Sequence, residues 1–220
     1  MRMYLRHPLL SSLGVEHGFG TTGSELRPTC LTVNQVHGTK IVSSCDYRDC
    51  EGAPEGDGMV TGEKEIEVGV WTADCLPVLS STESGTFVGA FHAGWRGATA
   101  GIVPSGLQKI SGESRVPVSE LVVVLGPAIG PCCYEVGPEV WEAVRLKTPS
   151  YTQLAERTLD LWGLVTHQLL LAGVPEENIG CISLCTRCHP ELFYSHRGWG
   201  KQRGKRSMLN YIRPANDDRH

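Results

Sequence analysis

Two apolar runs cover residues 76–80 and 86–92 in the middle of the chain. The polar segment 81–85, which ends in Gly85, separates them. A short polar loop between runs rich in β-branched and aromatic residues predicts a β-hairpin. Because neighbouring strands lie about 5 Å apart, we expect strand pairing to bring Cys75 back to within about one residue of His92.

The remaining hydrophobic pattern predicts a mixture of strands and helices. Apolar runs predict strands at 31–36, 40–44, 66–71, 121–125 and 179–184, and a polar loop at 45–58. Helices are expected at 99–110, 137–144 and 160–172, the last with Gly173 as its C-terminal stop and Pro175 beyond it. Strands and helices mix without a strict βαβ rhythm, so the predicted fold class is α+β (mixed α/β). No repeat or linker divides the chain, which predicts a single domain over residues 1–220.

Composition and charge narrow the classes of partner. The 220 residues are 40% hydrophobic and 20% charged, with a net charge of −4. Such a balance does not favour nucleic-acid binding. No apolar run approaches the ~18 residues that span a membrane, and the first 20 residues lack the apolar core of a signal peptide. We therefore expect a cytoplasmic protein, a monomer, with a small-molecule partner.

Nine cysteines would be reduced in the cytosol, so they are packing residues, metal ligands or nucleophiles. Cys75 and His92 are joined by a third candidate, His37, which ends another apolar run. One Cys and two His fill three positions of a tetrahedral zinc and leave the fourth open, which is the catalytic pattern. A buried Cys is more commonly a small hydrophobe, but small, polar and charged residues interrupt the strands beside Cys75 and His92, which favours a functional role.

Three other segments carry possible chemistry. The loop 126–137 contains Cys132 and Cys133; adjacent cysteines point in different directions, so at most one is expected to face a site, and a rigid Gly/Pro turn is favoured. The segment 185–189 matches the C-x-x-C-H motif of haem attachment, which requires export, and as a zinc site it lacks a second pair at finger-like spacing downstream. The basic segment 197–206 is either a solvated end or an anion site.

Six motifs, in order along nearly the whole chain, resemble the laccase-domain family. Its members are also described as multicopper polyphenol oxidases, purine nucleoside phosphorylases and peptidoglycan editing factors. The motifs are Asn34-Gln35-Val36-His37-Gly38, Asp57-Gly58, Ala73-Asp74-Cys75, His92-Ala93-Gly94-Trp95-Arg96-Gly97, Gly126-Pro127-x-Ile129 with Cys133-Tyr134, and Cys185-Thr186 with Phe193-Tyr194-Ser195-x-Arg197.

The resemblance implies a four-layer α/β/β/α sandwich, a fold shared with some cysteine-hydrolase-like toxins. It also implies a metal site of His37, Cys75 and His92. Family members phosphorolyse adenosine, inosine and methylthioadenosine and deaminate adenosine. An open-site zinc lowers the pKa of bound water towards neutrality, which gives a hydroxide able to attack adenine C6. Zinc is therefore the expected cofactor, with copper as the other possible metal.

Phosphorolysis additionally needs a phosphate held against ribose C1′ and stabilisation of the departing base. The candidates for phosphate binding are Arg96 and Arg197, followed by Lys40. Asp74 or Asp57 would act as acid/base or would orient a ligand histidine. The resemblance adds Asn34 and Gln35 as substrate-binding residues.

Three alternatives stay open at this point. One is copper-dependent oxidation of phenols, although one Cys/His₂ site and eight histidines match multicopper chemistry poorly, and copper binds most N/S sites in preference to zinc. Another is a hydrolase that edits peptidoglycan precursors, with Cys75 as nucleophile and a histidine as base. The third is a zinc-stabilised binding module, which the open fourth ligand position disfavours.

Overall fold

The computed structural model describes residues 3–152, 157–199 and 206–216, and it contains two mixed sheets. In spatial order, the six-stranded sheet consists of β3 (Ile41–Ser43), β4 (Gly58–Thr61), β7 (Val88–Ala93), β6 (Leu76–Thr82), β8 (Leu121–Leu125) and β9 (Ile179–Cys181). The four-stranded sheet consists of β1 (Glu16–Gly18), β10 (Met208–Arg213), β5 (Val68–Thr72) and β2 (Leu31–Thr32).

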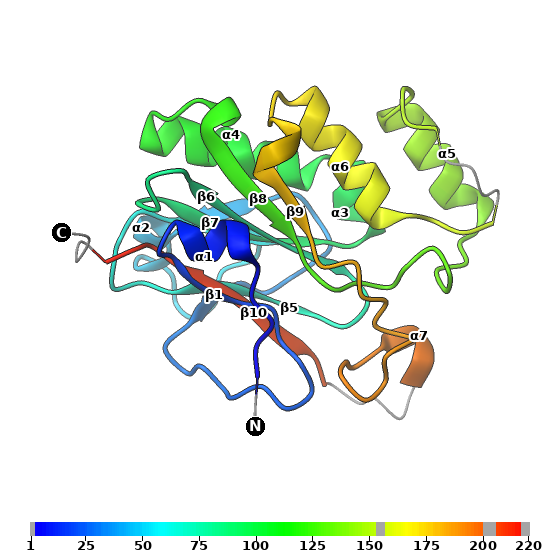
Figure 1. The fold of residues 1–220 in the computed structure, drawn as a ribbon, viewed down its shortest axis with the longest axis horizontal. Coiled ribbons are helices and arrows are strands. Elements are labelled where there is room, and N and C mark those ends of the chain that lie inside the picture. The colour runs from blue at the N-terminus through cyan, green and yellow to red at the C-terminus, as the bar shows by residue number, and fades with distance from the viewer. Residues whose placement is uncertain (1–2, 153–156, 200–205, 217–220) are drawn as a thin grey trace.

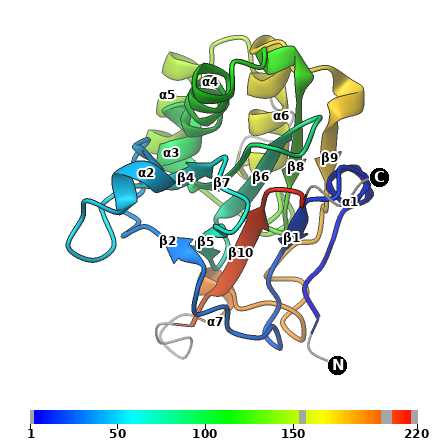
Figure 2. The same ribbon diagram turned by 90° about the vertical axis from the view of Figure 1, so that its left-hand side faces the viewer.

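The helices lie mainly on one side of the six-stranded sheet. They are α1 (Pro8–Ser12), α2 (Ser44–Tyr47), α3 (Trp95–Thr99), α4 (Ile102–Ser114), α5 (Pro138–Lys147), α6 (Leu161–Leu171) and α7 (His196–Trp199). Figure 1 shows α3 to α6 above that sheet and the four-stranded sheet below it. In the turned view the same order of helices, large sheet and small sheet is seen edge-on (Figure 2). The α+β class is therefore confirmed, whereas the fourth, helical layer of the expected sandwich stays a prediction.

Two apolar cores hold these layers together. One lies between α3 to α6 and the six-stranded sheet and includes Val78, Leu107 and Leu164, all fully buried. The other lies between the sheets, where Val70 of β5 and Leu79 of β6 are fully buried. Leu79 and Val78 thus serve opposite faces of one strand, as the period of two requires. The described helices include none that is long and apolar enough to cross a membrane.

The central hairpin is confirmed, with a small difference in register. β6 pairs antiparallel with β7, and Leu76 lies opposite Ala93 while Pro77 lies opposite His92. Extending this register places Cys75 opposite Gly94. The offset between Cys75 and His92 is therefore two residues, whereas about one residue was expected. Both strands are buried along their whole length. His92 lies on β7, and Cys75 directly precedes β6.

The predicted helix 99–110 is wrong in its start, because two helices occupy this region. α3 ends at Thr99, Gly101 adopts a left-handed φ of +83°, and α4 then runs from Ile102 to Ser114. Glycine takes this φ without a Cβ penalty, and Pro104 lies in the first turn of α4, where its missing N–H is not needed.

Other boundaries differ because tertiary contacts outweigh local pattern. The predicted strand 31–36 is shortened to Leu31 and Thr32, followed by an isolated bridge from Asn34 to Glu55. The chain then turns, and the amides of Val36 and His37 donate to a buried carboxylate. The predicted loop 45–58 contains most of α2 and ends where β4 begins. β1 and β10, which pair with each other, were not predicted from the pattern. The strand at 121–125 is confirmed, as are helices close to the predicted 137–144 and 160–172.

Candidate metal centre and substrate cavity

Asp57, immediately before β4, organises the centre of the site. Its side chain is fully buried and accepts backbone N–H bonds from Val36 at 3.2 Å, His37 at 2.9 Å and Gly38 at 2.6 Å. His37 has a φ of +61°, a left-handed conformation that costs a non-glycine residue about 1–3 kcal/mol. The three bonds to one carboxylate hold the loop in this conformation and fix the direction of the His37 side chain.

The same carboxylate orients a second histidine. His92 lies on β7, and its Nδ1 is 2.8 Å from Oδ1 of Asp57. Since a carboxylate accepts, Nδ1 donates to Asp57, and Nε2 is the ring nitrogen left to bind a metal ion once it has lost its own proton. Orientation of a histidine by a carboxylate is typical of metal ligands. Asp57 thus positions both histidines: it binds the backbone N–H of His37 and the ring of His92.

Cys75 completes the cluster. It follows Asp74, whose φ of +88° turns the chain sharply between β5 and β6. The ligand atoms of His37, Cys75 and His92 lie within 4.8 Å of one another. His37 is exposed, Cys75 is half-buried and His92 is buried, so the trio has one open side.

Gly94 leaves the space that the cluster occupies. A Cβ on this residue would stand 2.8 Å from Nδ1 of His37 and 3.1 Å from Sγ of Cys75. Gly94 has an ordinary φ of −68°, so glycine is required here by crowding and not by backbone conformation. This close approach explains one glycine of the 92–97 motif.

The pKa values of Cys75, His92 and Asp57 are shifted by the groups around them. Burial alone would raise the pKa of the Cys75 thiol, but hydrogen bonds with His37 and His92 outweigh it and lower that pKa to about 6. Burial alone would lower the pKa of His92, but its hydrogen bonds with Asp57 and Cys75 raise it to about 9. Asp57 is held below its usual pKa, despite burial, by His92 and the backbone amides. A thiolate and a charged imidazole therefore coexist near neutral pH.

This donor set fits a zinc ion. Zinc takes Cys S at about 2.3 Å and His N at about 2.0–2.1 Å, in a tetrahedron whose fourth position stays open in catalytic sites. One thiolate and two imidazoles within a 4.8 Å span, with a carboxylate behind one imidazole, meet these requirements.

The open side of the trio faces a cavity of about 840 Å³. The trio itself lines this cavity, together with Val33, Asn34, Gln35, Trp71, Thr72, Ala73, Asp74, Ile129, Tyr134, His196, Arg197 and Ser207. The volume is within the range of small-molecule sites, about 300–1,000 Å³. Aromatic, amide, acidic and basic side chains from five separate segments therefore converge beside the candidate metal ligands.

Asp74 joins three of these segments. Its Oδ1 accepts from Thr186 Oγ1 at 2.6 Å, and its Oδ2 accepts from the backbone N–H of Arg197 at 2.7 Å. The backbone carbonyl of Asp74 accepts from Ile129 N at 2.9 Å. The turn before β6 is thus tied to the loops that follow β8 and β9.

The other predicted residues divide into two groups. Arg197 lines the cavity, where its Nη1 donates to the carbonyl of Glu135 at 2.9 Å and its guanidinium lies 5.2 Å from the Tyr134 ring centre. Arg96 and Lys40 are exposed and are not lining residues; Arg96 stacks on Trp95 at 4.3 Å. Of the basic segment 197–206, residues 200–205 lie outside the described residues.

Asn34 and Gln35, the predicted substrate-binding residues, line the cavity, and Gln35 also has a structural task. Its amide pairs with the backbone of Trp71, accepting from Trp71 N at 2.7 Å and donating to Trp71 O at 2.8 Å. Sequence reasoning did not single out Trp71 or His196. An aromatic residue at the end of a strand and a histidine beside Arg197 were the available signals.

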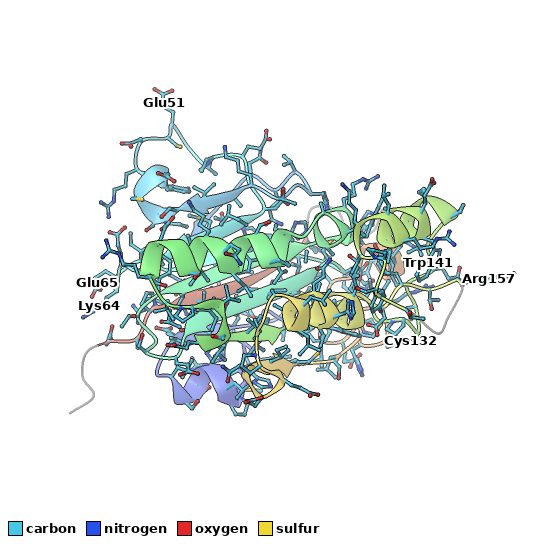
Figure 3. All side chains as sticks on the ribbon, turned by 90° about the horizontal axis from the view of Figure 1, so that it is seen from above. Glu51, Lys64, Glu65, Cys132, Trp141 and Arg157 are labelled. Atoms are coloured by element: carbon cyan, nitrogen blue, oxygen red, sulfur yellow. The ribbon has the colours of Figure 1, made fainter. Side chains whose placement is uncertain are left out.

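A second sulfur-rich cluster lies on the surface at the end of the molecule that carries α5. Sγ of Cys188 is 3.6 Å from Sγ of Cys132 and 3.5 Å from Sγ of Cys133, and Cys185 completes a group whose sulfurs all lie within 4.8 Å. Figure 3 shows Cys132 at the same end of the molecule as Trp141 of α5. The expectation that at most one of the adjacent cysteines faces a site is wrong: the turn at 130–134 brings both sulfurs to Cys188.

Comparison with known proteins identifies the relatives of this chain. The family described as multi-copper polyphenol oxidoreductase laccase matches residues 19–213. A protein of Pseudomonas aeruginosa named purine nucleoside phosphorylase is 41% identical over 79% of this chain and 69% of its own. The protein named purine nucleoside phosphorylase YlmD of Geobacillus stearothermophilus is 36% identical over 74% of this chain.

Solved structures agree with these matches. The crystal structure of YlmD from Geobacillus stearothermophilus superposes with a TM-score of 0.82 at 26% identity, covering 98% of this chain and 100% of that one. A Neisseria meningitidis protein superposes with a TM-score of 0.73 at 30% identity, covering 85% of this chain and 75% of that one. The sequence match spans 65% of the curated Geobacillus protein and 34% of a human relative that is also named a purine nucleoside phosphorylase.

Proposed function

We propose that the chain, which belongs to the multi-copper polyphenol oxidoreductase laccase family, is a zinc-dependent purine nucleoside phosphorylase that also deaminates adenosine. One observation carries the proposal: the trio of His37, Cys75 and His92 opens onto the cavity that contains Arg197. Relatives named purine nucleoside phosphorylases support the substrate class. Adenosine, inosine and methylthioadenosine are the proposed nucleosides, and phosphate is the second substrate.

Each part of the cavity has a task in this reaction. Arg197 lines the cavity and suits bidentate binding of phosphate. The rings of Trp71 and Tyr134 offer faces for stacking of the purine. Asp74 lines the cavity and is the proposed acid/base group, while Asp57 is a positioning residue that holds the two histidines. Bound zinc would supply Lewis acidity and activate water.

Phosphorolysis and deamination share this site but differ in their nucleophile. In phosphorolysis, a phosphate oxygen forms a bond to ribose C1′ while the C1′–N9 bond breaks, and the purine takes up a proton. In deamination, water adds at adenine C6 and ammonia leaves. Phosphate binding by Arg197 is needed only for the first reaction. The cytoplasm, where nucleosides and phosphate coexist, is the proposed location, and the proposed state is a monomer.

A specific observation favours a second candidate function. Cys75, His92 and Asp57 form a chain of contacts, sulfur to imidazole to carboxylate, and the pKa of Cys75 is lowered to about 6. This is the arrangement of a thiol nucleophile with its base and orienting group. Without metal, the site would suit a hydrolase that cleaves an acyl bond in a substrate such as a peptidoglycan precursor.

Oxidation of phenols at several coppers is not favoured by the donor sets. Within residues 3–152, 157–199 and 206–216, the clusters of three or more metal-binding side chains are the His₂Cys trio and the four cysteines. Neither contains the many histidines that multicopper chemistry needs.

The decisive experiment incubates the purified, zinc-loaded protein with adenosine and phosphate and separates the products by chromatography. Adenine and ribose 1-phosphate should form, with some inosine; omission of phosphate should suppress adenine and leave inosine. Cys75→Ser should abolish both reactions together with the zinc of this site, whereas Cys50→Ser, at an exposed cysteine that does not line the cavity, should change neither. No turnover of nucleosides, together with zinc-independent cleavage of a peptidoglycan precursor that is lost on alkylation of Cys75, would replace this proposal with the thiol hydrolase.

A further inference from the structure

Four cysteines from two loops converge outside the nucleoside site. Cys132 and Cys133 lie in the loop after β8, and Cys185 and Cys188 lie in the loop after β9. Strands β8 and β9 are parallel neighbours, so their carboxyl ends, and the loops that follow, emerge at the same edge of the sheet. The sequence separates the two pairs by more than fifty residues, but the topology places them together.

The backbone around the cluster is ordered by bonds of its own. Thr186 N donates to Ala128 O at 2.9 Å, and Ala128 and Cys185 form an isolated parallel bridge. The N–H groups of Cys133 and Tyr134 both donate to Gly130 O at 2.9 Å, which closes a tight turn. Gly130 N in turn donates to Sγ of Cys185 at 3.3 Å. An amide directed at a cysteine sulfur stabilises its thiolate form.

The spacing of the sulfurs fits one tetrahedral ion. A zinc ion with four sulfurs at about 2.3 Å places neighbouring sulfurs about 3.8 Å apart. The contacts from Cys188 to Cys132 and Cys133 are 3.6 Å and 3.5 Å, and all pairs are within 4.8 Å. A disulfide would need about 2.05 Å, and all four residues are free thiols here.

Packing does not account for this cluster. A free cysteine that serves as a small hydrophobe is buried, but Cys132 and Cys188 are exposed and Cys133 is half-buried; of the four, only Cys185 is buried. Three cysteines that are at least partly exposed thus lie beside a buried one, so an ion can reach the cluster from solvent.

We infer that Cys132, Cys133, Cys185 and Cys188 bind a structural zinc ion that joins the loop after β8 to the loop after β9. Each thiol would lose its proton to solvent as its sulfur binds the metal. Four protein ligands leave no open position, which distinguishes this closed site from the open His₂Cys trio. The site is independent of the nucleoside chemistry and stands whether or not that proposal is correct.

The position of this site gives it a consequence for the cavity. Tyr134 directly follows Cys133 and lines the cavity, and Arg197 contacts Tyr134 and the carbonyl of Glu135. Thr186, which directly follows Cys185, donates to Asp74. A metal at the cysteines would therefore hold one wall of the cavity without touching a substrate.

Metal analysis of the full-length protein tests the inference. Wild-type protein purified under reducing conditions should hold about two zinc ions per chain by elemental analysis. Cys188→Ser should hold about one, and so should Cys75→Ser, while the double variant should hold about none. Cys50→Ser, which removes an exposed thiol elsewhere, should keep two. Cys188→His should restore the lost ion, because Cys₃His is also a zinc ligand set.

A spectroscopic readout separates metal loss from unfolding. Cobalt substituted at a four-sulfur site gives intense sulfur-to-cobalt charge-transfer absorption, which Cys188→Ser should largely remove while Cys75→Ser keeps most of it. Amide hydrogen exchange in the loops 126–137 and 182–195 should rise in Cys188→Ser and stay as in wild type in Cys50→Ser. Iron in place of zinc, a disulfide between any two of the four cysteines in reduced protein, or full zinc content in folded Cys188→Ser would overturn the inference.

Discussion

Oδ1 of Asp57 lies 2.8 Å from Nδ1 of His92, and the same oxygen accepts the backbone N–H of His37 at 2.9 Å. One buried oxygen thus sets the positions of two candidate metal ligands that are more than fifty residues apart in the chain. Asp57 does not line the cavity. Its influence on the metal is exerted through the two histidines, and its removal is expected to affect metal affinity before it affects anything else in the cavity.

Asp57→Asn should weaken zinc binding at the trio by about 10- to 100-fold, the usual effect of removing a carboxylate that orients a ligand histidine. The amide keeps the shape of the side chain but lacks the negative charge of the carboxylate, which stabilises the proton on Nδ1 of His92. Competition with a chromophoric chelator, in a Cys188→Ser background, measures the affinity of this site alone. Asp49→Asn, at an exposed position, is the control, and equal affinity in both variants would contradict the role given to Asp57.

Gly94→Ala should also reduce zinc affinity, through crowding. The added Cβ would approach Nδ1 of His37 to 2.8 Å and Sγ of Cys75 to 3.1 Å, so the ligands must move apart. Gly112→Ala provides a matched control, because a Cβ there meets nothing within 4 Å and alanine favours the helix by up to about 1 kcal/mol. Zinc titration should separate the two variants, and retention of wild-type affinity in Gly94→Ala would count against the trio as the binding site.

The reactivity of Cys75 in metal-free protein should follow its pKa of about 6. As pH rises through 6 the thiolate forms, so alkylation by iodoacetamide should be half-maximal near that pH, well below the value of about 8.5 typical of a free cysteine. His92→Ala removes a hydrogen bond that favours the thiolate and should move the profile to higher pH. Quantification of the Cys75 peptide by mass spectrometry gives the rate. A profile that His92→Ala leaves in place would show that the histidine does not set the pKa.

Arg197→Gln should raise the KM for phosphate by about 10- to 100-fold, as expected for loss of a charged hydrogen bond worth about 1.5–3 kcal/mol. Deamination, which uses no phosphate, should be nearly unchanged. Arg96→Gln is the informative comparison, because Arg96 stacks on Trp95 and does not line the cavity. Steady-state kinetics with adenosine decide between them. A larger phosphate effect in Arg96→Gln would restore Arg96 as the anion-binding residue.

Local pattern was sufficient for the hairpin that carries Cys75 and His92. A polar loop between two apolar runs fixes which strands pair, since the connection is short and the strands are adjacent. The same holds for the buried strand at 121–125 and for the helices near 137–144 and 160–172, where propensity, capping residues and burial agree. His37 was predicted as the third ligand because it ends another apolar run, and the resemblance to a known family implied the same trio.

Contacts between distant segments decided the rest. Asp57 stands at the end of a polar loop, and nothing local indicates that it collects three amides and a histidine; the pairing of β4 with β7 brings it there. The cavity is formed where β5, α7 and the loop after β8 meet. Only the tertiary structure therefore shows that Arg197 lines it and that Arg96 does not. The four cysteines are another example. They come together because β8 and β9 are parallel neighbours, and strand pairing between distant segments cannot be inferred from the periodicity of the sequence.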